Sequence, residues 1–147
     1  MRLDEINHKI VKYLNDGRRS LGEIARELSI STNTVRSRVT RLRNARVFDI
    51  VGVVDPDKLD GHYMVLVGVK LKTPNLVKKG EEFSRLRGVV SVAVVTGQFD
   101  LFLTVLLNNE FGLLDFYTQE VSKIEEVRST ETFVAYKNYN WNVPYCL

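Results

Sequence analysis

From Ser20 to Arg43 the chain reads SLGEIARELSISTNTVRSRVTRLR, and this stretch decides how its first third folds. Ser20 and Glu23 have the spacing of a capping box, in which each side chain satisfies the other residue's free backbone N–H, so a helix is expected to begin at Leu21. After a break, Ser31 has the residue type and place to cap a second helix. We therefore predict two short helices joined by a tight turn, which is the helix-turn-helix pattern.

The second of these helices buries a narrow apolar stripe and exposes polar and basic side chains. Val35, Val39 and Leu42 recur at the spacing of a buried helical face. The exposed remainder suits the major groove of DNA, where short polar groups and arginines pair with base edges and further arginines neutralise phosphates. A solvated basic helix on some other domain is the alternative, and the caps and spacing favour DNA. The residues predicted to contact double-stranded DNA are Ser31, Thr32, Asn33, Thr34, Arg36, Ser37, Arg38, Arg41 and Arg43.

Charge and composition support this division of the 147-residue chain. Residues 1–47 hold 11 Lys and Arg against 5 Asp and Glu, a balance of +6, whereas the remainder has a balance of −3. Only the first part is therefore expected to face a polyanion. The single cysteine, Cys146, excludes an internal disulfide and a cysteine-rich metal site. Without an apolar run of signal or membrane-spanning length, we expect a cytoplasmic protein with no membrane partner.

The chain is expected to form two domains joined by a short linker. A first helix over residues 3–14 would complete a three-helix unit, and FDIVGVV at 48–54 is typical of a short strand. We place a winged-helix-like, helix-turn-helix domain at 1–50, a strand linker at 51–61 and a second domain at 62–147.

The second domain alternates strands with helices. The order β-α-β-β-α-β predicts a ferredoxin-like α+β fold with both helices on one face of the sheet. Strands are expected at 63–72, 89–96, 99–107 and 130–139, and helices at 74–86 and 111–121. The helical residues expected to point inward are Leu76, Val77, Phe83 and Leu86 in the first helix, and Leu114, Tyr117 and Val121 in the second.

The central hairpin is apolar on both faces. Leu101, Leu103 and Val105 alternate with Phe102 and Leu106, although the helices can cover only one side. An apolar face left in water favours association, so we predict a homodimer that joins its sheets and holds two helix-turn-helix units at a fixed separation. The alternative is that the C-terminal tail or the linker strand covers this face within one chain.

The whole chain resembles the Lrp/AsnC family of feast/famine transcriptional regulators. The resemblance rests on LDEINHKIVKYLNDGRRS, EIARELSISTNTVRSRVTRL, VGVVDPDKL, VTGQFDLFLTV and VRSTETFVAY, in this order along the chain. It implies a DNA-binding domain, a tether strand and a RAM domain that dimerises and associates further, to octamers in many members. It also implies a small-molecule effector, usually an amino acid, bound between dimers near the hairpin loop.

Carried over by motif, the resemblance implies an effector site at Thr96, Gly97 and Asp100, with Thr132, Phe133 and Val134 as lining residues. Asp100 would accept from the ammonium group of an amino acid, and backbone N–H groups near Gly97 would donate to its carboxylate. The alternative is that Gly97 serves only the turn and Asp100 only fixes the hairpin. The aromatic tail from Tyr139 to Leu147 has no counterpart in the resemblance.

Two other functional classes remain. An enzyme is disfavoured, because His8 and His62 are the only histidines and no phosphate-binding loop, metal-ligand cluster or nucleophile with its base is present. No cofactor is expected. A sensing or assembly protein that no longer binds DNA is disfavoured by the row of arginines, which repel one another and need a partner. We therefore predict a sequence-specific transcriptional regulator whose DNA binding or assembly responds to a small molecule.

Overall fold

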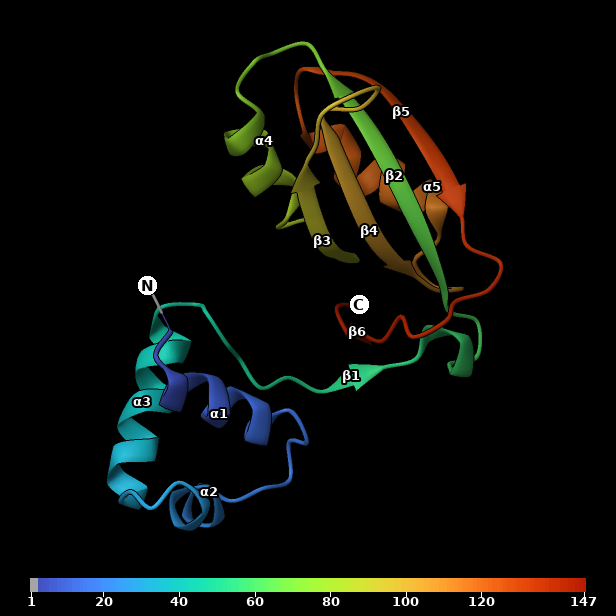
Figure 1. Cartoon of the computed structure of the whole chain (residues 1–147). Coiled ribbons are helices and arrows are strands. Elements are labelled where there is room, and N and C mark those ends of the chain that lie inside the picture. Colours follow the sequence, from blue (N-terminus) through green and yellow to red (C-terminus); the bar gives the residue numbers. More distant parts are fainter. Residues whose placement is uncertain (1–2) are drawn as a thin grey trace. The chain divides into compact units, whose positions relative to one another are not determined.

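Three helices form the N-terminal part of the chain (Figure 1). In the computed structural model, which describes residues 3–147, α1 spans Glu5–Leu14, α2 spans Leu21–Glu27 and α3 spans Thr32–Asn44. Their shared core contains Ile10, Leu14, Ile24, Ala25, Val35 and Val39. The chain divides by its contacts into two units, one ending at Val51 and the other beginning at Gly52.

The caps of α2 and α3 confirm the predicted helix-turn-helix. The Ser20 hydroxyl accepts from the Glu23 N–H at 3.2 Å, and the Glu23 carboxylate accepts from the Ser20 N–H at 2.7 Å. Ser31 accepts from the N–H of Thr34 at 3.1 Å. Ser29, with φ at +53°, makes the turn between the two helices. Each helix therefore begins where its own side chains satisfy its first free N–H groups.

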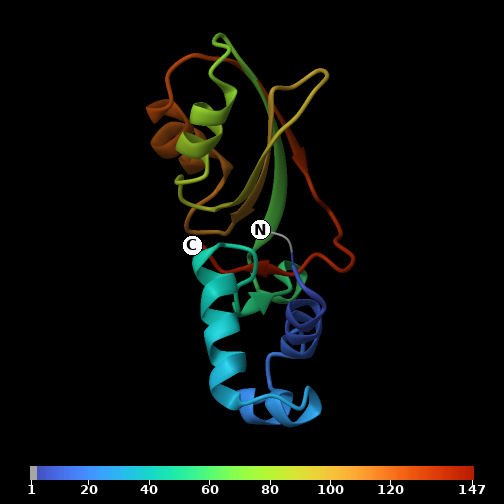
Figure 2. The same cartoon turned by 60° about the vertical axis from the view of Figure 1, so that its left-hand side comes forward.

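A four-stranded antiparallel sheet organises the second unit (Figures 1 and 2). Its strands are β2 (Tyr63–Leu71), β3 (Val89–Val94), β4 (Leu101–Leu107) and β5 (Val127–Val134), in the spatial order β3-β4-β2-β5. One face is covered by α4 (Leu76–Phe83) and by the helical run α5 (Leu113–Asp115), η2 (Phe116–Glu120, a π-helix) and η3 (Val121–Lys123). This is the predicted ferredoxin-like topology. No helix within residues 3–147 is long and apolar enough to cross a membrane.

The main core lies between the sheet and its helices. Val65, Val67 and Val69 of β2 are fully buried there because alternate residues of a strand point to the same face. Phe83 and Phe116 reach them from the helices. Two of the predicted inward positions are wrong, since Val77 is 70% exposed and Leu114 is 76% exposed. In α4 the inward face is set by Leu76 and Phe83, and Val77 lies about 100° around the helix from Leu76. In the second segment Leu113 and Phe116 take the inward positions, and Leu114 points outward.

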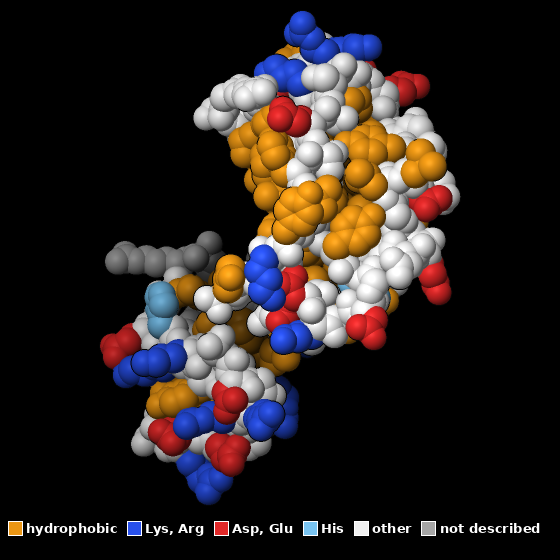
Figure 3. Space-filling model, turned by 90° about the vertical axis from the view of Figure 1, so that its right-hand side faces the viewer, with side chains coloured by type: hydrophobic (Ala, Val, Ile, Leu, Met, Phe, Trp, Pro, Cys, Tyr) orange, Lys and Arg blue, Asp and Glu red, His pale blue; other side chains and the backbone are white. Residues whose placement is uncertain are grey.

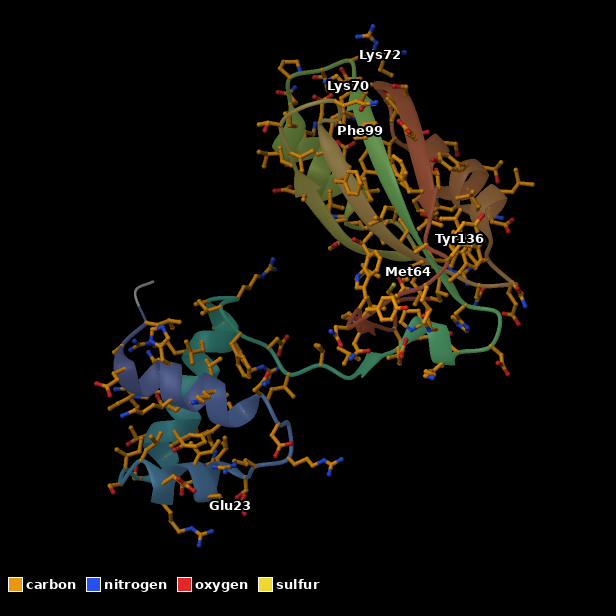
Figure 4. The ribbon with its side chains drawn as sticks, turned by 45° about the vertical axis from the view of Figure 1, so that its right-hand side comes forward. Glu23, Met64, Lys70, Lys72, Phe99 and Tyr136 are labelled. Carbon is orange, nitrogen blue, oxygen red and sulfur yellow. The ribbon has the colours of Figure 1, made fainter. Side chains whose placement is uncertain are left out.

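We call the other side of the sheet the open face, and its two ends differ. At one end, β1 (Val53–Val54) pairs with β6 (Val143–Pro144), and Val143 packs on the buried side chains of Met64 and Leu106. Figure 4 shows Met64 at this end of the sheet. Trp141 and Cys146 of the tail add to the cluster. The tail and linker thus cover part of the open face within one chain, as the alternative interpretation held.

The other end of the open face carries an aromatic patch, defined as Phe99, Phe102 and Phe133. Their ring centroids lie 6.0–6.5 Å apart in every pair. Phe99 and Phe102 are half-buried and Phe133 is 43% exposed. Further hydrophobic side chains gather on the side of this unit that carries β5 (Figure 3), where Val134, Tyr136 and Tyr139 are exposed. Apolar surface of this kind is typical of an association site.

The linker strand and the last strand of the sheet differ from their predicted bounds. Only Val53 and Val54 of the predicted strand 48–54 are paired, because β6 offers two partners, and Phe48 packs on the helical core instead. Residues 3–51 contain no strand. The last strand begins at Val127 and ends at Val134, not at 130 and 139, since its partner β2 begins at Tyr63 and leaves the later residues without a neighbour.

Candidate DNA-binding surface and effector region

The exposed face of α3 presents a continuous polar and basic surface. A shallow depression of about 460 Å³ runs along it, lined by Asn33, Arg36, Ser37, Thr40, Arg41 and Asn44. All six residues are exposed. Thr40 and Asn44 were absent from the predicted contacts, yet they follow Ser37 and Arg36 at helical spacing and so share their face. The helical period, applied without regard to residue charge, would have included them.

Local hydrogen bonds order the front of this surface. The hydroxyl groups of Ser31 and Thr34 lie 2.8 Å apart, and Ser31 also caps the helix. One turn on, the Arg36 guanidinium donates to the Asn33 side-chain oxygen at 3.0 Å. These contacts fix the rotamers of groups able to pair with base edges or phosphates, which lowers the entropy lost on binding. Thr32 lies exposed beside them at the first position of the helix.

Two of the predicted arginines have partners elsewhere in the helical unit. Arg43 donates through Nε to the Asp49 carboxylate at 2.8 Å and stays largely exposed. Arg38 is half-buried, and its guanidinium lies 2.6 Å from the carboxylate of Asp4, the N-cap of α1. The structure therefore does not place Arg38 among the exposed side chains of α3, although helical spacing predicts it there.

The effector residues predicted in the hairpin serve its geometry. Gly97 has φ at +120°, a conformation that favours glycine, and Thr96 is exposed beside it in the loop between β3 and β4. Asp100 accepts at 2.8 Å from both the Leu71 N–H and the Lys70 ammonium. These two donors, the N–H first and then the ammonium, hold the pKa of Asp100 below its usual value. This arrangement favours the interpretation in which Asp100 fixes the hairpin to β2.

The other predicted effector residues do not share a face. Thr132 pairs with Val67 and Val134 with Val65, on the helix-covered side, and the Thr132 hydroxyl lies 2.7 Å from that of Tyr117. Phe133 points to the open face and belongs to the aromatic patch. Consecutive strand residues alternate between faces, so one chain cannot bring these three side chains together. A pocket that used them all would need groups from a second chain.

The described residues contain no assembled metal site. Within residues 3–147 no three His, Cys, Asp or Glu side chains cluster as metal ligands. His8 is exposed, and its Nδ1 lies 3.0 Å from the Asp4 carbonyl oxygen at the start of α1. His62 lies 3.4 Å from the Tyr145 hydroxyl.

Comparison with known proteins places both units in one family. Residues 3–43 match the AsnC-type helix-turn-helix domain, and residues 64–142 match the Lrp/AsnC ligand binding domain. An uncharacterized HTH-type transcriptional regulator of Pyrococcus furiosus is 32% identical, with 95% of each chain covered.

Solved structures share the fold at lower identity. E. coli AsnC is 22% identical, with a TM-score of 0.70 over 94% of this chain and 95% of that one. A Neisseria meningitidis transcriptional regulator, solved as a complex with L-Met, is 17% identical, with a TM-score of 0.71 over 99% of this chain and 96% of that one. Both units, in the same order and over nearly full length, thus have counterparts in one group of regulators, and the chain belongs to the Lrp/AsnC family of HTH-type transcriptional regulators.

Proposed function

We propose that the chain regulates transcription by placing α3 in the major groove of duplex DNA. The observation that carries this proposal is the ordered, exposed surface of α3, on which amide, hydroxyl and guanidinium groups lie side by side on a capped helix. Such groups read base edges and neutralise phosphates. The proposed contacts are Ser31, Thr32, Asn33, Thr34, Arg36, Ser37, Thr40, Arg41, Arg43 and Asn44. Residues 1–50 carry this activity, 51–61 connect the parts and 62–147 associate.

Association through the open face supports the same function. The aromatic patch leaves apolar area in water that a second copy of the chain would cover, at roughly 25 cal/mol for each Å² buried. A two-fold pair would present two α3 helices to two half-sites. Because the tail already covers the Met64 end, the contact between copies is centred on the patch.

An amino acid is the proposed effector. The Neisseria relative was solved with L-Met, which supports this class of ligand. In this chain Thr132 and Val134 lie on one face of β5 and Phe133 on the other, so the proposed site combines the loop around Gly97 with groups of a neighbouring copy. Such a site exists only in the assembly, which couples ligand binding to association.

Selection from a random duplex pool tests DNA recognition. The purified chain is expected to enrich a motif with two related halves about one helical turn apart. Asn33→Ala is expected to relax the base preference at one position in each half of the motif. Arg26→Ala removes a positive charge from α2 instead of α3, and it is expected to leave the motif unchanged. An unchanged motif with Asn33→Ala removes that residue from base readout, and failure to enrich any motif overturns the proposed function.

Thermal-shift measurement against the twenty free amino acids, coupled to light scattering, tests the effector. A true effector raises the melting temperature with its concentration and changes the mass of the assembly in the same range. If no amino acid shifts either quantity, the amino-acid proposal fails while DNA recognition stands on its own test.

A further inference from the structure

Arg38 lies in the middle of α3, but it is bonded to the start of α1. Its Nη1 donates to the Asp4 carboxylate at 2.6 Å and to the side-chain oxygen of Asn7 at 3.0 Å. The Arg38 side chain is 26% exposed, against 55% for Arg43 on the same helix. Since each residue turns an α-helix by about 100°, Arg38 lies about 200° around the helix from both Arg36 and Thr40.

The two acceptors of Arg38 are themselves held in place. One oxygen of Asp4 caps α1 by accepting from the Asn7 N–H at 2.7 Å, while the other takes the Arg38 guanidinium. These contacts, that of Arg38 first, hold the pKa of Asp4 below its usual value, so the carboxylate is charged at neutral pH. Asn7 is 3% exposed, and without Arg38 its buried amide oxygen would lose this donor.

We propose that Arg38 is a positioning residue, which forms with Asp4 and Asn7 a clamp that fixes α3 against the start of α1 and leaves Arg38 out of direct contact with DNA. This inference rests on the proposed DNA-binding function. The clamp crosses between two helices whose shared apolar core is small, and directed, charge-assisted bonds fix an orientation that apolar packing alone leaves loose. The side chains of α3 that face DNA inherit that orientation, so affinity depends on a residue that DNA does not touch.

Asp4→Asn separates this role from a direct contact. Asparagine caps a helix as well as aspartate does, so α1 keeps its start, while the charge that holds Arg38 is lost. If Arg38 contacted phosphate, releasing it and removing a nearby negative charge would tighten DNA binding and leave the salt slope unchanged or steeper. The clamp predicts the opposite change in affinity. Asp4→Asn should weaken binding about 3-fold to 30-fold at every salt concentration, with the slope of log K against log salt unchanged.

The experiment uses the full chain and duplex carrying its selected motif, below the melting temperature of every variant. Arg38→Ala should weaken binding like Asp4→Asn, and the double variant should be no weaker than Arg38→Ala alone. Arg36→Ala serves as the matched control and should lower the slope by about 0.9 per lost phosphate contact.

The outcomes distinguish the clamp from a direct DNA contact, from general destabilisation and from failure of the proposed function. Tighter binding by Asp4→Asn, or a slope lowered by Arg38→Ala as much as by Arg36→Ala, overturns the clamp and makes Arg38 a DNA contact. Affinity lost only in proportion to the unfolded fraction, as measured by circular dichroism, also overturns it, because general destabilisation then suffices. An unaltered chain that binds no duplex overturns the proposed function itself, a failure distinct from that of the clamp.

Discussion

A single methyl group added at Gly68 should reveal how the aromatic patch is built. Gly68 lies buried in the middle of β2, and a Cβ there would lie 2.6–2.7 Å from three atoms of the Phe99 ring. Figure 4 shows Phe99 over this part of the sheet. The ring occupies the space that a side chain would otherwise fill. Gly68→Ala therefore forces the ring of Phe99 away from its contacts with Phe102 and Phe133.

Two opposing contributions set the size of the effect. Alanine is preferred to glycine inside a strand by about 0.5–1 kcal/mol. Each aromatic pair contributes about 0.5–1.5 kcal/mol beyond its buried area, and Phe99 makes two such pairs. Gly68→Ala should therefore lower the free energy of unfolding by about 1 kcal/mol. In a Phe99→Ala background the clash is gone, and the same substitution should raise it by about 0.5–1 kcal/mol.

Urea unfolding of four proteins measures both effects: the unaltered chain, Gly68→Ala, Phe99→Ala and the double variant. Far-UV circular dichroism follows the transition at one fixed chain concentration, because association would add to the apparent stability. The sign of the Gly68→Ala effect should reverse between the two backgrounds. A methyl group that destabilises equally with and without the Phe99 ring, or that stabilises in both cases, would refute the account of the patch.

Three further changes test other parts of the structure. Arg41→Ala should reduce the salt slope of DNA binding by about 0.9, so that affinity changes about 3.5-fold less between 50 and 200 mM salt, and an unaltered slope would place Arg41 away from phosphate. Asp100→Ala removes the acceptor of the Lys70 ammonium and should lower the melting temperature by calorimetry; an unshifted transition would contradict a structural role. The pKa of Asp57 is lowered from 3.8 to about 2, chiefly by the Lys137 ammonium and next by Asn138. Ionised Asp57 therefore stabilises the fold fully at any pH above 3.8, the pKa of this group in the unfolded chain. That stabilisation should be lost as the pH falls from 3.8 toward 2, and acid titration of Asp57→Asn should lack this component; an identical titration curve would argue against it.

Features set by residues close together in the chain could be predicted from the sequence. Ser20 with Glu23, and Ser31 before α3, fix helix starts through bonds that span three residues, so the helix-turn-helix was confirmed. The strands expected at 63–72 and 99–107 likewise lie at Tyr63–Leu71 and Leu101–Leu107, because a pattern of neighbouring residues predicts them. In these cases the local physics and the overall fold require the same conformation.

Features set by distant partners could not be predicted. The ion pair of Arg38 with Asp4 spans 34 positions, and helical spacing alone made Arg38 look like its exposed neighbours. The bounds of β1 depended on a two-residue partner near the end of the chain. For the effector region, motif order suggested one site, but Thr132 and Phe133 belong to opposite faces of β5. The sequence periodicity of a single chain carries no signal for a site that a second chain would complete.

The pairing of Val53 and Val54 with Pro144 and Val143 joins the two ends of the second unit. During synthesis on a ribosome, the helical unit has all its partners once residue 51 has emerged, and it can fold while the rest is still being made. The sheet must wait, because the central strand β2 needs β5 as its neighbour and the first strand needs nearly the last residues. Until the last residues have been made, the nascent chain therefore carries a helical unit that can already fold, followed by apolar strands that need protection from aggregation.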